Sequence, residues 1–394
     1  MSLRFGRPMV SIPGPSTIPD RVLNAMHRPM PNIYQGELVD IAFEMLDRLP
    51  AIARTTTAHP FITVSNGHGA WQMAINNTLS RGDRVLVLET GNFAKNWGQM
   101  AATSGVIVEA LEADWRSPVD LEAFSERLEA DTEKGIKAIL VVLTDTATSV
   151  RNDIKAIGEV LQAADHPALL MVDCIASLCC DVYEMDAWGV DVTVAGSQKG
   201  LMVPPGLGFV WAGPRALTAY ETADLRTGYF DWEPRRTPDL MYKIFAGTPP
   251  IQHLYGLKEA LNMMDEEGGL EKIWRRHEIL AGAIHAAIAA WSSPGGLDFN
   301  IIEPAARSHA VTTVLCNDID ATELRRRAEE SAGLVLGLGI ANMGNAFRIG
   351  HMGHLNPPHV LGTLGTIEAT LHSMGAPIGS SGVAAAAASL APHF

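Results

Sequence analysis

The sequence predicts an α/β protein in which a large domain, built on a mostly parallel mixed sheet, is followed by a smaller α+β C-terminal domain. Between Pro60 and Ala212, short apolar runs alternate with segments of helical periodicity, and this alternation is typical of parallel sheets covered by helices. After about Pro250 the alternation stops, and a long helical stretch leads into a few separate strands. A chain of 394 residues is long enough for the two domains that this change of pattern indicates.

The large domain is predicted to follow an extended arm. The first residues are rich in Pro and Gly and predict an arm over residues 1–18, with a helix from about Asp20. Apolar runs then predict strands at Phe61–Val64, Arg84–Glu89, Val106–Leu111, Ala138–Leu143, Ala168–Val172, Val190–Ala195 and Leu207–Ala212. The run Ala138–Leu143 is apolar throughout, as expected of a strand buried on both faces. Helices are predicted at Trp71–Leu79 and Asp153–Ala164.

The domain boundary is expected inside one long helical stretch, Tyr255–Trp291. We place the large domain at residues 19–265 and the small domain at residues 266–394. Strands of the small domain are predicted at Ala310–Leu315 and Phe347–Ile349. The chain ends in an alanine-rich segment from Gly379, which is expected either to pack as a terminal element or to fray.

The charge and hydropathy of the chain exclude two classes of partner. The formal net charge is −14 and no concentrated basic face is present, so we expect no binding of nucleic acid. The N-terminus lacks the apolar core of a signal peptide, and no apolar run reaches transmembrane length. We therefore expect a soluble, cytoplasmic protein with no membrane partner.

Neither the cysteines nor the histidines predict a metal site. Three of the four cysteines lie within Cys174–Cys180, without the spacing of a zinc site or a disulfide framework. They are expected to be free thiols in a reducing compartment. His351, His354 and His359 have spacing that resembles a metal site but lack a clear acidic or cysteine partner, so structural or surface roles are expected.

Lys199 is the lysine in the most unusual surroundings. It follows the apolar strand predicted at Val190–Ala195 and precedes an apolar segment that ends in Pro204-Pro205-Gly206. A lysine at the carboxyl end of such a strand lies where open α/β sheets bind ligands. Burial there would lower its pKa and leave a neutral amine that can form an imine. From position alone, an ordinary loop lysine is the favoured alternative.

Asp173 ends an otherwise apolar strand, 26 residues before Lys199 (199 − 173). A buried carboxylate is costly, so it should have a cationic or hydrogen-bond-donating partner. One such partner is the protonated ring nitrogen of a pyridoxal cofactor, which can then absorb the electrons of a carbanion. A helix N-cap is an equally good interpretation of this position.

The turn from Ser65 to Ala70 joins a strand to a helix and contains two glycines. Its free N–H groups and the helix dipole would make a site for an anion such as a single phosphate group. The chain has no G-x-x-x-x-G-K-[ST] motif, so a nucleotide-binding loop is not indicated. Within the turn, His68 is expected either to contact the phosphate or to cap the helix.

Arg348 is a charged residue within a predicted strand of the small domain. A guanidinium in that position suits the bidentate capture of a substrate carboxylate. A structural ion pair is the favoured alternative when the residue is considered alone.

Taken together, these motifs resemble the class V aminotransferases of fold type I, especially the alanine–glyoxylate and serine–glyoxylate transaminases. The resemblance covers nearly the whole chain from Ile12-Pro13-Gly14-Pro15 onward, and its most specific part is Gly196-Ser197-Gln198-Lys199-Gly200. Further matches are Thr248-Pro249-Pro250 and Arg348–Gly353. It implies a fold type I PLP-transferase with pyridoxal 5'-phosphate as the cofactor.

The resemblance also implies a role for each candidate residue. Lys199 would bind the cofactor as a Schiff base and then move the substrate proton, and Asp173 would pair with the pyridine nitrogen. By the same resemblance, Gly67, His68 and Gln198 would bind the phosphate, together with Thr248 from the other subunit. Phe93 would stack on the ring face, and Thr146 would contact the phenolic oxygen. Arg348 and Tyr34 would contact the substrate. The implied assembly is a homodimer with shared active sites, or a higher oligomer.

The implied reaction is the transfer of an amino group from a small L-amino acid, alanine or serine, to glyoxylate by a ping-pong mechanism. Four features depart from the common family pattern: Asn66–Ala70 at the phosphate turn, Leu143–Ser149, Phe245 in place of a tyrosine, and the substrate-side segment Asn32–Gly36. A different pair of substrates, as in pyridoxamine–pyruvate, aspartate–glyoxylate or ureidoglycine–glyoxylate transaminases, or a PLP lyase, is therefore the alternative. A non-catalytic binding protein would be expected to lack Lys199 or Asp173, and both are present.

Overall fold

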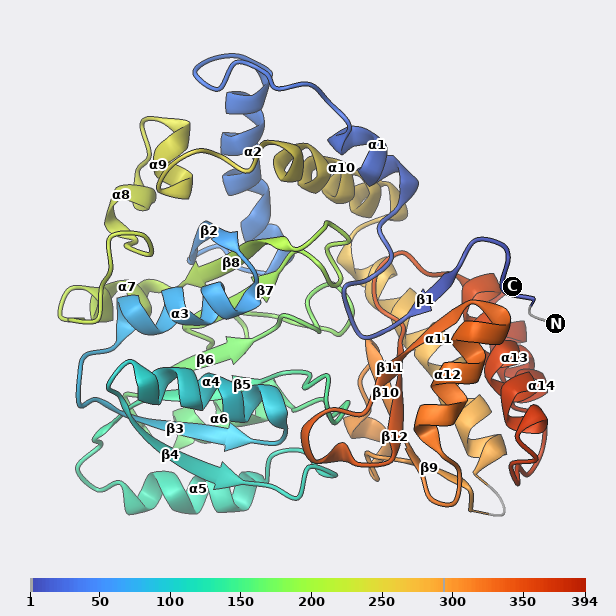
Figure 1. Cartoon of the computed structure of the whole chain (residues 1–394). Coiled ribbons are helices and arrows are strands. Elements are labelled where there is room, and N and C mark those ends of the chain that lie inside the picture. Colours follow the sequence, from blue (N-terminus) through green and yellow to red (C-terminus); the bar gives the residue numbers. More distant parts are fainter. Residues whose placement is uncertain (1–2, 293–294) are drawn as a thin grey trace.

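The computed structural model describes residues 3–292 and 295–394 and contains two layered bodies, each built on one sheet (Figure 1). Residues 1–2 of the predicted arm and residues 293–294 of the predicted small domain lie outside the described residues. The large body contains a seven-stranded sheet in the order β2-β8-β7-β6-β5-β3-β4. The small body contains a five-stranded sheet in the order β1-β11-β12-β10-β9. The predicted α/β class with a mostly parallel mixed sheet is confirmed.

The strands of the large sheet all overlap predicted strands. They are β2 (His59–Ser65), β3 (Arg84–Glu89), β4 (Ile107–Glu112), β5 (Ile136–Val142), β6 (Leu169–Asp173), β7 (Val192–Gly196) and β8 (Gly206–Ala212). Neighbouring strands from β3 to β7 are parallel, whereas β8 runs antiparallel to both β7 and β2. The carboxyl ends of β5, β6 and β7 therefore meet at one edge of the sheet.

Helices cover both faces of this sheet, which explains why its central strands are apolar throughout. The helices of the large body are α1 (Asp20–Met26), α2 (Glu37–Ile52), α3 (Gly67–Thr78), α4 (Asn92–Thr103), α5 (Leu121–Ala130), α6 (Ile154–Ala163), α7 (Pro214–Tyr220), α8 (Glu233–Arg236), α9 (Met241–Phe245) and α10 (Ile251–Glu267). Apolar residues of α3 and α4 pack in one hydrophobic cluster, and those of α2, α5 and α6 in another. Successive residues of β5 alternate between the two clusters, with Leu140 in the first and Ile139 in the second.

The small body packs its helices on a short, mainly antiparallel sheet. Its elements are β9 (Leu297–Phe299), β10 (Val311–Cys316), β11 (Leu334–Leu338), β12 (Ala346–Gly350), α11 (Leu270–Trp291), α12 (Ala321–Ala332), α13 (Pro357–Ser373) and α14 (Gly382–Leu390), with 3₁₀ turns at Pro304–Ala306, Ala341–Met343 and Ala391–His393. In the alanine-rich tail, Ala386 and Leu390 are buried in the same cluster as residues of α11 and α13. Of the two expectations for the tail, packing is therefore confirmed.

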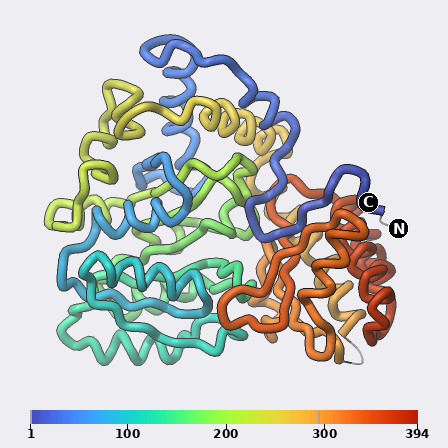
Figure 2. Tube along the Cα trace, in the orientation of Figure 1, coloured from blue at the N-terminus to red at the C-terminus, as the bar shows by residue number. Residues whose placement is uncertain are grey.

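The N-terminal arm contributes a strand to the small sheet. Strand β1 (Met9–Ser11) pairs in parallel with β11, with Met9 opposite Leu334. The arm then runs along the junction between the two bodies before it enters α1 (Figure 2). The sequence predicts an extended arm here but not this pairing, because nothing in a three-residue strand specifies its partner.

Two helices replace the single helical stretch predicted from Tyr255 to Trp291. Helix α10 ends at Glu267 and α11 begins at Leu270. Between them Gly268 and Gly269 have φ angles of 103° and 84°, a left-handed conformation that favours glycine and ends a helix. The domain division between residues 265 and 266 stays a prediction. Among the described residues, none of the helices combines the length and the apolar character needed to cross a membrane.

Candidate active site

A cavity of about 120 Å³ lies at the carboxyl ends of β5, β6 and β7. Seven of the ten candidate residues named from the sequence line it: Gly67, His68, Phe93, Thr146, Asp173, Gln198 and Lys199. Three other candidates, Tyr34, Thr248 and Arg348, are not among its lining residues. The structure thus brings together residues that are up to 132 positions apart in the chain (199 − 67).

Lys199 projects from the loop after β7 into this cavity. Its Nζ donates a hydrogen bond to the carbonyl oxygen of Pro13, which belongs to the N-terminal arm. Burial, together with the nearby Arg348 guanidinium, lowers the pKa of this amine to about 8, against the opposing effect of Asp173. The loop-lysine alternative does not describe this residue, because its amine is buried and faces a carboxylate.

We expect Lys199 to react as a nucleophile near neutral pH. With a pKa of about 8 the amine is mostly protonated below that pH and mostly neutral above it, and only the neutral form is nucleophilic. Acetic anhydride applied to the cofactor-free protein at increasing pH should therefore acetylate Lys199 half-maximally near pH 8, as measured by peptide mass spectrometry. Removing the negative neighbour in Asp173→Asn should move this midpoint lower. A midpoint near that of a lysine in water, about 10.4, would contradict the expectation.

Asp173 is the last residue of β6, and only 2% of its surface is exposed. Its Oδ2 accepts a hydrogen bond of 2.8 Å from Trp71 Nε1, and its Oδ1 accepts one of 2.6 Å from the Ile175 N–H. Burial raises the pKa of this carboxyl to about 7, although both hydrogen bonds oppose the rise. The next regular element is β7, so the helix N-cap interpretation of Asp173 is wrong.

The glycine-containing turn is tighter than the sequence predicts, because α3 begins at Gly67 rather than near Trp71. Asn66 caps the helix, and its Oδ1 accepts the N–H groups of His68 and Gly69 at 3.1 and 3.4 Å. His68 therefore does not act as the cap. Its ring contacts Trp71 edge to face at 4.6 Å, and burial lowers its pKa, which favours the neutral imidazole.

Two features of this corner leave room for an anion. A Cβ atom on Gly67 would collide with the side chain of Ile175, so only glycine lets the start of α3 approach the cavity this closely. The amide oxygen of Gln198 is buried and has no hydrogen-bond partner within the described chain. Rotation of the Gln198 side-chain amide by about 180° exchanges its oxygen and its NH₂ group. The NH₂ group can then donate to an anion beside the N-terminus of α3.

Asp145 fixes the aromatic wall of the cavity. It is fully buried, and its Oδ2 accepts the backbone N–H groups of Phe93 and Ala94 at 2.6 and 3.2 Å. Its other oxygen accepts the N–H of Ala147 at 2.9 Å. Phe93 contacts Trp71 at 6.4 Å between ring centroids. Asp145 therefore accepts free N–H groups of the first turn of α4 and so keeps Phe93 against the cavity.

Arg348 lies in the middle of β12, paired with Thr313 of β10. Its Nη1 donates to the carbonyl oxygen of Thr146 at 2.7 Å, and its Nε donates to that of Leu338 at 2.6 Å. Burial lowers the pKa of the guanidinium to about 10. Its hydrogen-bond partners are thus backbone carbonyls rather than a carboxylate, while the negative charge of the buried Asp145 nearby opposes the lowering of its pKa.

Tyr34 and Thr248 lie away from the cavity in this single chain. Tyr34 is 85% exposed, and Thr248 is also exposed. Two residues that do shape the cavity, Trp71 and Asp145, were not among the candidates predicted from the sequence. Trp71 could have been found, because it lies four positions after Gly67 and hence on the same side of α3. Asp145 could have been found as a second acidic residue just after an apolar strand.

Comparisons with known proteins agree with this geometry. The family described as aminotransferase class-V matches the chain over residues 44–341. The chain is 39% identical to serine–glyoxylate aminotransferase of Arabidopsis thaliana over 99% of its length and 96% of that protein. It is 36% identical to L-aspartate–glyoxylate aminotransferase of Paracoccus denitrificans, over 96% of the chain and 94% of that protein. The solved structure of pyridoxamine–pyruvate aminotransferase from Mesorhizobium loti superposes with a TM-score of 0.91 at 25% identity, covering all of both chains.

Proposed function

The chain belongs to the class-V aminotransferase family and is a transaminase, and we propose that it moves an amino group from serine or alanine to glyoxylate. The observation that carries this proposal is that Lys199 and Asp173 line one cavity, with Arg348 near enough to lower the pKa of Lys199. The names of the relatives support the choice of substrates, because glyoxylate occurs in most of those at 35–39% identity.

The residues of the cavity fit pyridoxal 5'-phosphate. Gly67, His68 and Gln198 would hold the phosphate at the N-terminus of α3, where the buried and unpartnered amide of Gln198 supports an anion as ligand. Asp173 would pair with the ring nitrogen, and a cation there would offset the burial that raises the pKa of this carboxyl. Phe93 would contact the ring face and Thr146 the ring oxygen. Once bound, the cofactor supplies an electron sink for the substrate carbanion.

The residues of the chain supply binding and proton transfer. Arg348 binds the α-carboxylate of the amino acid or oxo acid, and its two hydrogen bonds to carbonyl oxygens hold the guanidinium in place. Lys199 Nζ, with a pKa of about 8, accepts and returns the proton of the reacting carbon near neutral pH. Trp71 and Phe93 exclude water from the same wall. Because one site serves both halves of the reaction, the first product leaves before the second substrate binds.

A panel of amino donors tests this proposal. With glyoxylate as the acceptor, we expect glycine to form faster from serine and alanine than from aspartate, and double-reciprocal plots to be parallel. A preference for aspartate, pyridoxamine or ureidoglycine would instead support an aspartate–glyoxylate, pyridoxamine–pyruvate or ureidoglycine–glyoxylate transaminase. Loss of the donor without formation of glycine would indicate a lyase, and an absence of reaction with every donor would contradict the proposal.

Replacing Arg348 with lysine should reduce substrate binding. Lysine keeps a positive charge but cannot donate in a bidentate manner, so we expect kcat/KM to fall about 10²-fold, mainly through KM. Cofactor content should not change. Arg235→Lys is a suitable control, because Arg235 is also a buried arginine that donates to backbone carbonyls and lies outside the cavity. A rise in KM in both variants would point to a general effect of losing a buried arginine.

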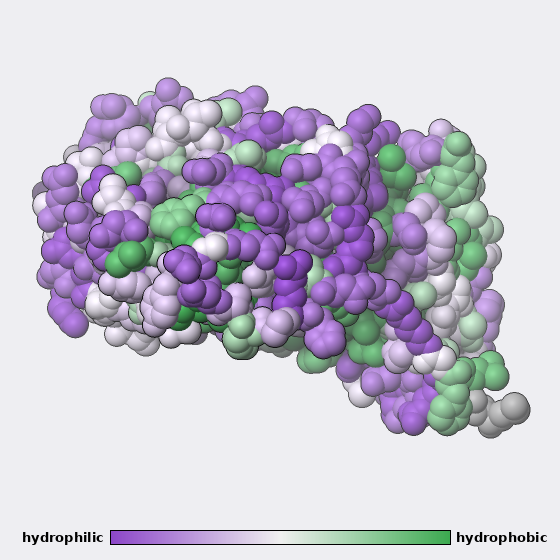
Figure 3. All heavy atoms as spheres, turned by 90° about the horizontal axis from the view of Figure 1, so that it is seen from above, coloured by the Kyte–Doolittle hydropathy of each residue, from purple (hydrophilic) through white to green (hydrophobic). Residues whose placement is uncertain are grey.

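We also propose a cytoplasmic homodimer with shared active sites. Exposed apolar side chains occur near Tyr34 and Thr248 in the sequence, and they include Leu23, Met30, Leu240 and Tyr242. Figure 3, which views this side of the molecule, shows hydrophobic patches between hydrophilic residues. A second copy would cover them and let Thr248 reach the partner's phosphate. The four cysteines are free and buried, which suits a reducing compartment.

A charge placed on this surface should separate the subunits. Tyr242 is 50% exposed and lies near Thr248, so Tyr242→Glu should weaken the dimer and with it the affinity for the cofactor. Sedimentation equilibrium and cofactor titration measure the two effects together. A fully dimeric variant, or a monomer with unchanged affinity for the cofactor, would argue against shared active sites.

A further inference from the structure

A buried carboxylate that takes no part in the proposed chemistry lies at the junction of the two bodies. Asp181 belongs to the loop between β6 and β7, the loop that begins after Asp173, and its side chain is 0% exposed. An ionised carboxylate in such a place is costly unless donors and basic groups surround it. The identity of those groups therefore indicates what the charge holds together.

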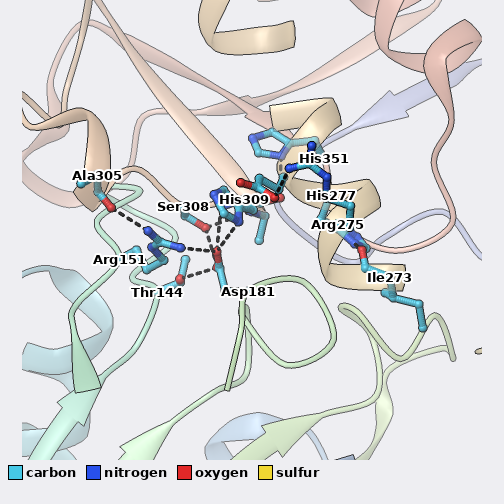
Figure 4. Close-up of polar contacts among 12 residues, drawn as sticks. Thr144, Arg151, Asp181, Ile273, Arg275, His277, Ala305, Ser308, His309 and His351 are labelled. Atoms are coloured by element: carbon cyan, nitrogen blue, oxygen red, sulfur yellow. Dashed lines mark hydrogen bonds and ion pairs between the residues drawn. The ribbon is translucent and has the colours of Figure 1, made fainter. Parts of the chain in front are cut away.

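The donors to Asp181 come from both bodies (Figure 4). From the large body, Thr144 Oγ1 donates at 3.0 Å. From the small body, Ser308 Oγ donates at 3.1 Å and the His309 N–H at 3.0 Å. Two basic groups lie slightly farther away, His309 Nδ1 at 3.4 Å and Arg151 Nη1 at 3.8 Å. Asp181 is thus the shared acceptor of a joint between the bodies.

On the side of the small body, the joint continues into the strands that carry Arg348. Ser308 and His309 lead directly into β10, where Thr313 pairs with Arg348 of β12. His351, just after β12, holds the same corner, because its Nδ1 lies 2.9 Å from the His309 carbonyl oxygen. The position of the Ser308–His309 corner therefore sets the position of Arg348.

On the side of the large body, the joint reaches the wall of the cavity. Thr144 lines the cavity. Two positions later, the carbonyl oxygen of Thr146 accepts the hydrogen bond from Arg348 Nη1 at 2.7 Å. The segment around Thr144 is therefore connected to Arg348 twice, once directly and once through Asp181.

We propose that Asp181 is a positioning residue for the substrate carboxylate. By holding Thr144 of the large body against Ser308 and His309 of the small body, it keeps Arg348 at the distance from the cavity that carboxylate binding requires. The inference rests on the proposed function, in which Arg348 binds the substrate carboxylate. Since Asp181 contacts none of the residues assigned to the cofactor, it acts on substrate binding rather than on proton transfer.

The isosteric variant Asp181→Asn tests this role in the cofactor-loaded enzyme. We expect KM for the amino donor to rise about tenfold while kcat stays within about twofold of wild type. The dissociation constant of a non-reacting carboxylate such as propionate, measured by calorimetry, should rise by the same factor. Ser308→Ala removes one donor from the small body and should raise KM in the same direction. The double variant should show less than the product of the two effects, since both changes act on one joint.

Asp131→Asn is the matched control. Asp131 is also a buried carboxylate beside an arginine and a histidine, Arg84 at 3.3 Å and His166 at 3.2 Å, but all three lie in the large body. We expect both Asp131→Asn and Asp181→Asn to lower the melting temperature, but Asp131→Asn to leave KM unchanged. The proposal is overturned if Asp181→Asn raises KM no more than this control, or lowers kcat and cofactor content at constant KM. If Arg348→Lys leaves the affinity for propionate unchanged, the proposed role of Arg348 fails instead.

Discussion

The Lys199→Ala variant is expected to fold and to lose transamination, with kcat at least about 10³-fold below wild type. The variant lacks both the amine that would bind the cofactor covalently and the group that would move the substrate proton. The cofactor should still enter the cavity, because the phosphate turn and Asp173 remain. Its visible absorbance should therefore be that of unlinked cofactor, and borohydride should no longer attach it to the protein.

The same variant has a second readout in the cofactor-free protein. Because burial lowers the pKa of Lys199 from 10.5 to about 8, the unfolded chain binds a proton that the folded chain has lost between these values. The free energy of unfolding of the wild type should consequently rise with pH across this window, and Lys199→Ala should lack that rise. Activity close to wild type, or an unchanged pH dependence of the free energy of unfolding, would contradict the proposed role of Lys199.

The second large effect is expected for Asp173→Asn, in which kcat should fall about 10²- to 10³-fold. Asparagine keeps the size of the side chain and one acceptor for the Trp71 or Ile175 N–H, but it cannot hold a proton on the cofactor ring by charge. Substrate KM should change little, because Arg348 is untouched. Steady-state kinetics together with the absorbance of the bound cofactor would separate the two effects.

Asp191→Asn is the control for the loss of a buried carboxylate next to the same sheet, because Asp191 immediately precedes β7. Asp191 accepts the Leu170 N–H at 2.8 Å and lies 3.2 Å from Arg215, outside the cavity. Burial raises its pKa to about 6. We expect this variant to lose stability and to keep kcat. An equal loss of kcat in both variants would mean that the position of Asp173 at the cavity does not matter.

The large sheet could be predicted because burial of its strands on both faces leaves a visible pattern in the sequence. Strands buried on both faces must be apolar at every position, so runs such as Ile139–Val142 are visible without knowledge of their neighbours. Helix ends were harder to predict. The cap at Asn66 moves the start of α3 to Gly67, and the Gly268-Gly269 turn divides one expected helix into two. Both depend on the backbone conformation of single residues, which hydrophobic periodicity does not describe.

The candidate site was predictable where one residue type had an unusual setting. Lys199 and Asp173 are polar residues at the ends of apolar strands, and that contrast is local. Trp71 and Asp145 gave a weaker contrast. The only local signals are the position of Trp71 four residues after Gly67 and that of Asp145 just after an apolar strand. Their importance comes from partners more than 50 positions away, since Trp71 donates to Asp173 and Asp145 accepts from Phe93.

The pairing of β1 with β11 bears on how the enzyme is made in the cell. The ribosome releases Met9 first, whereas its partner Leu334 follows 325 residues later (334 − 9). A large body that folds during synthesis must therefore wait with its N-terminal arm unpaired. Pro13, whose carbonyl oxygen accepts the hydrogen bond from Lys199, belongs to that arm. The hydrogen bond between Lys199 and Pro13 is consequently expected to form late, after the small body that holds the arm has been translated.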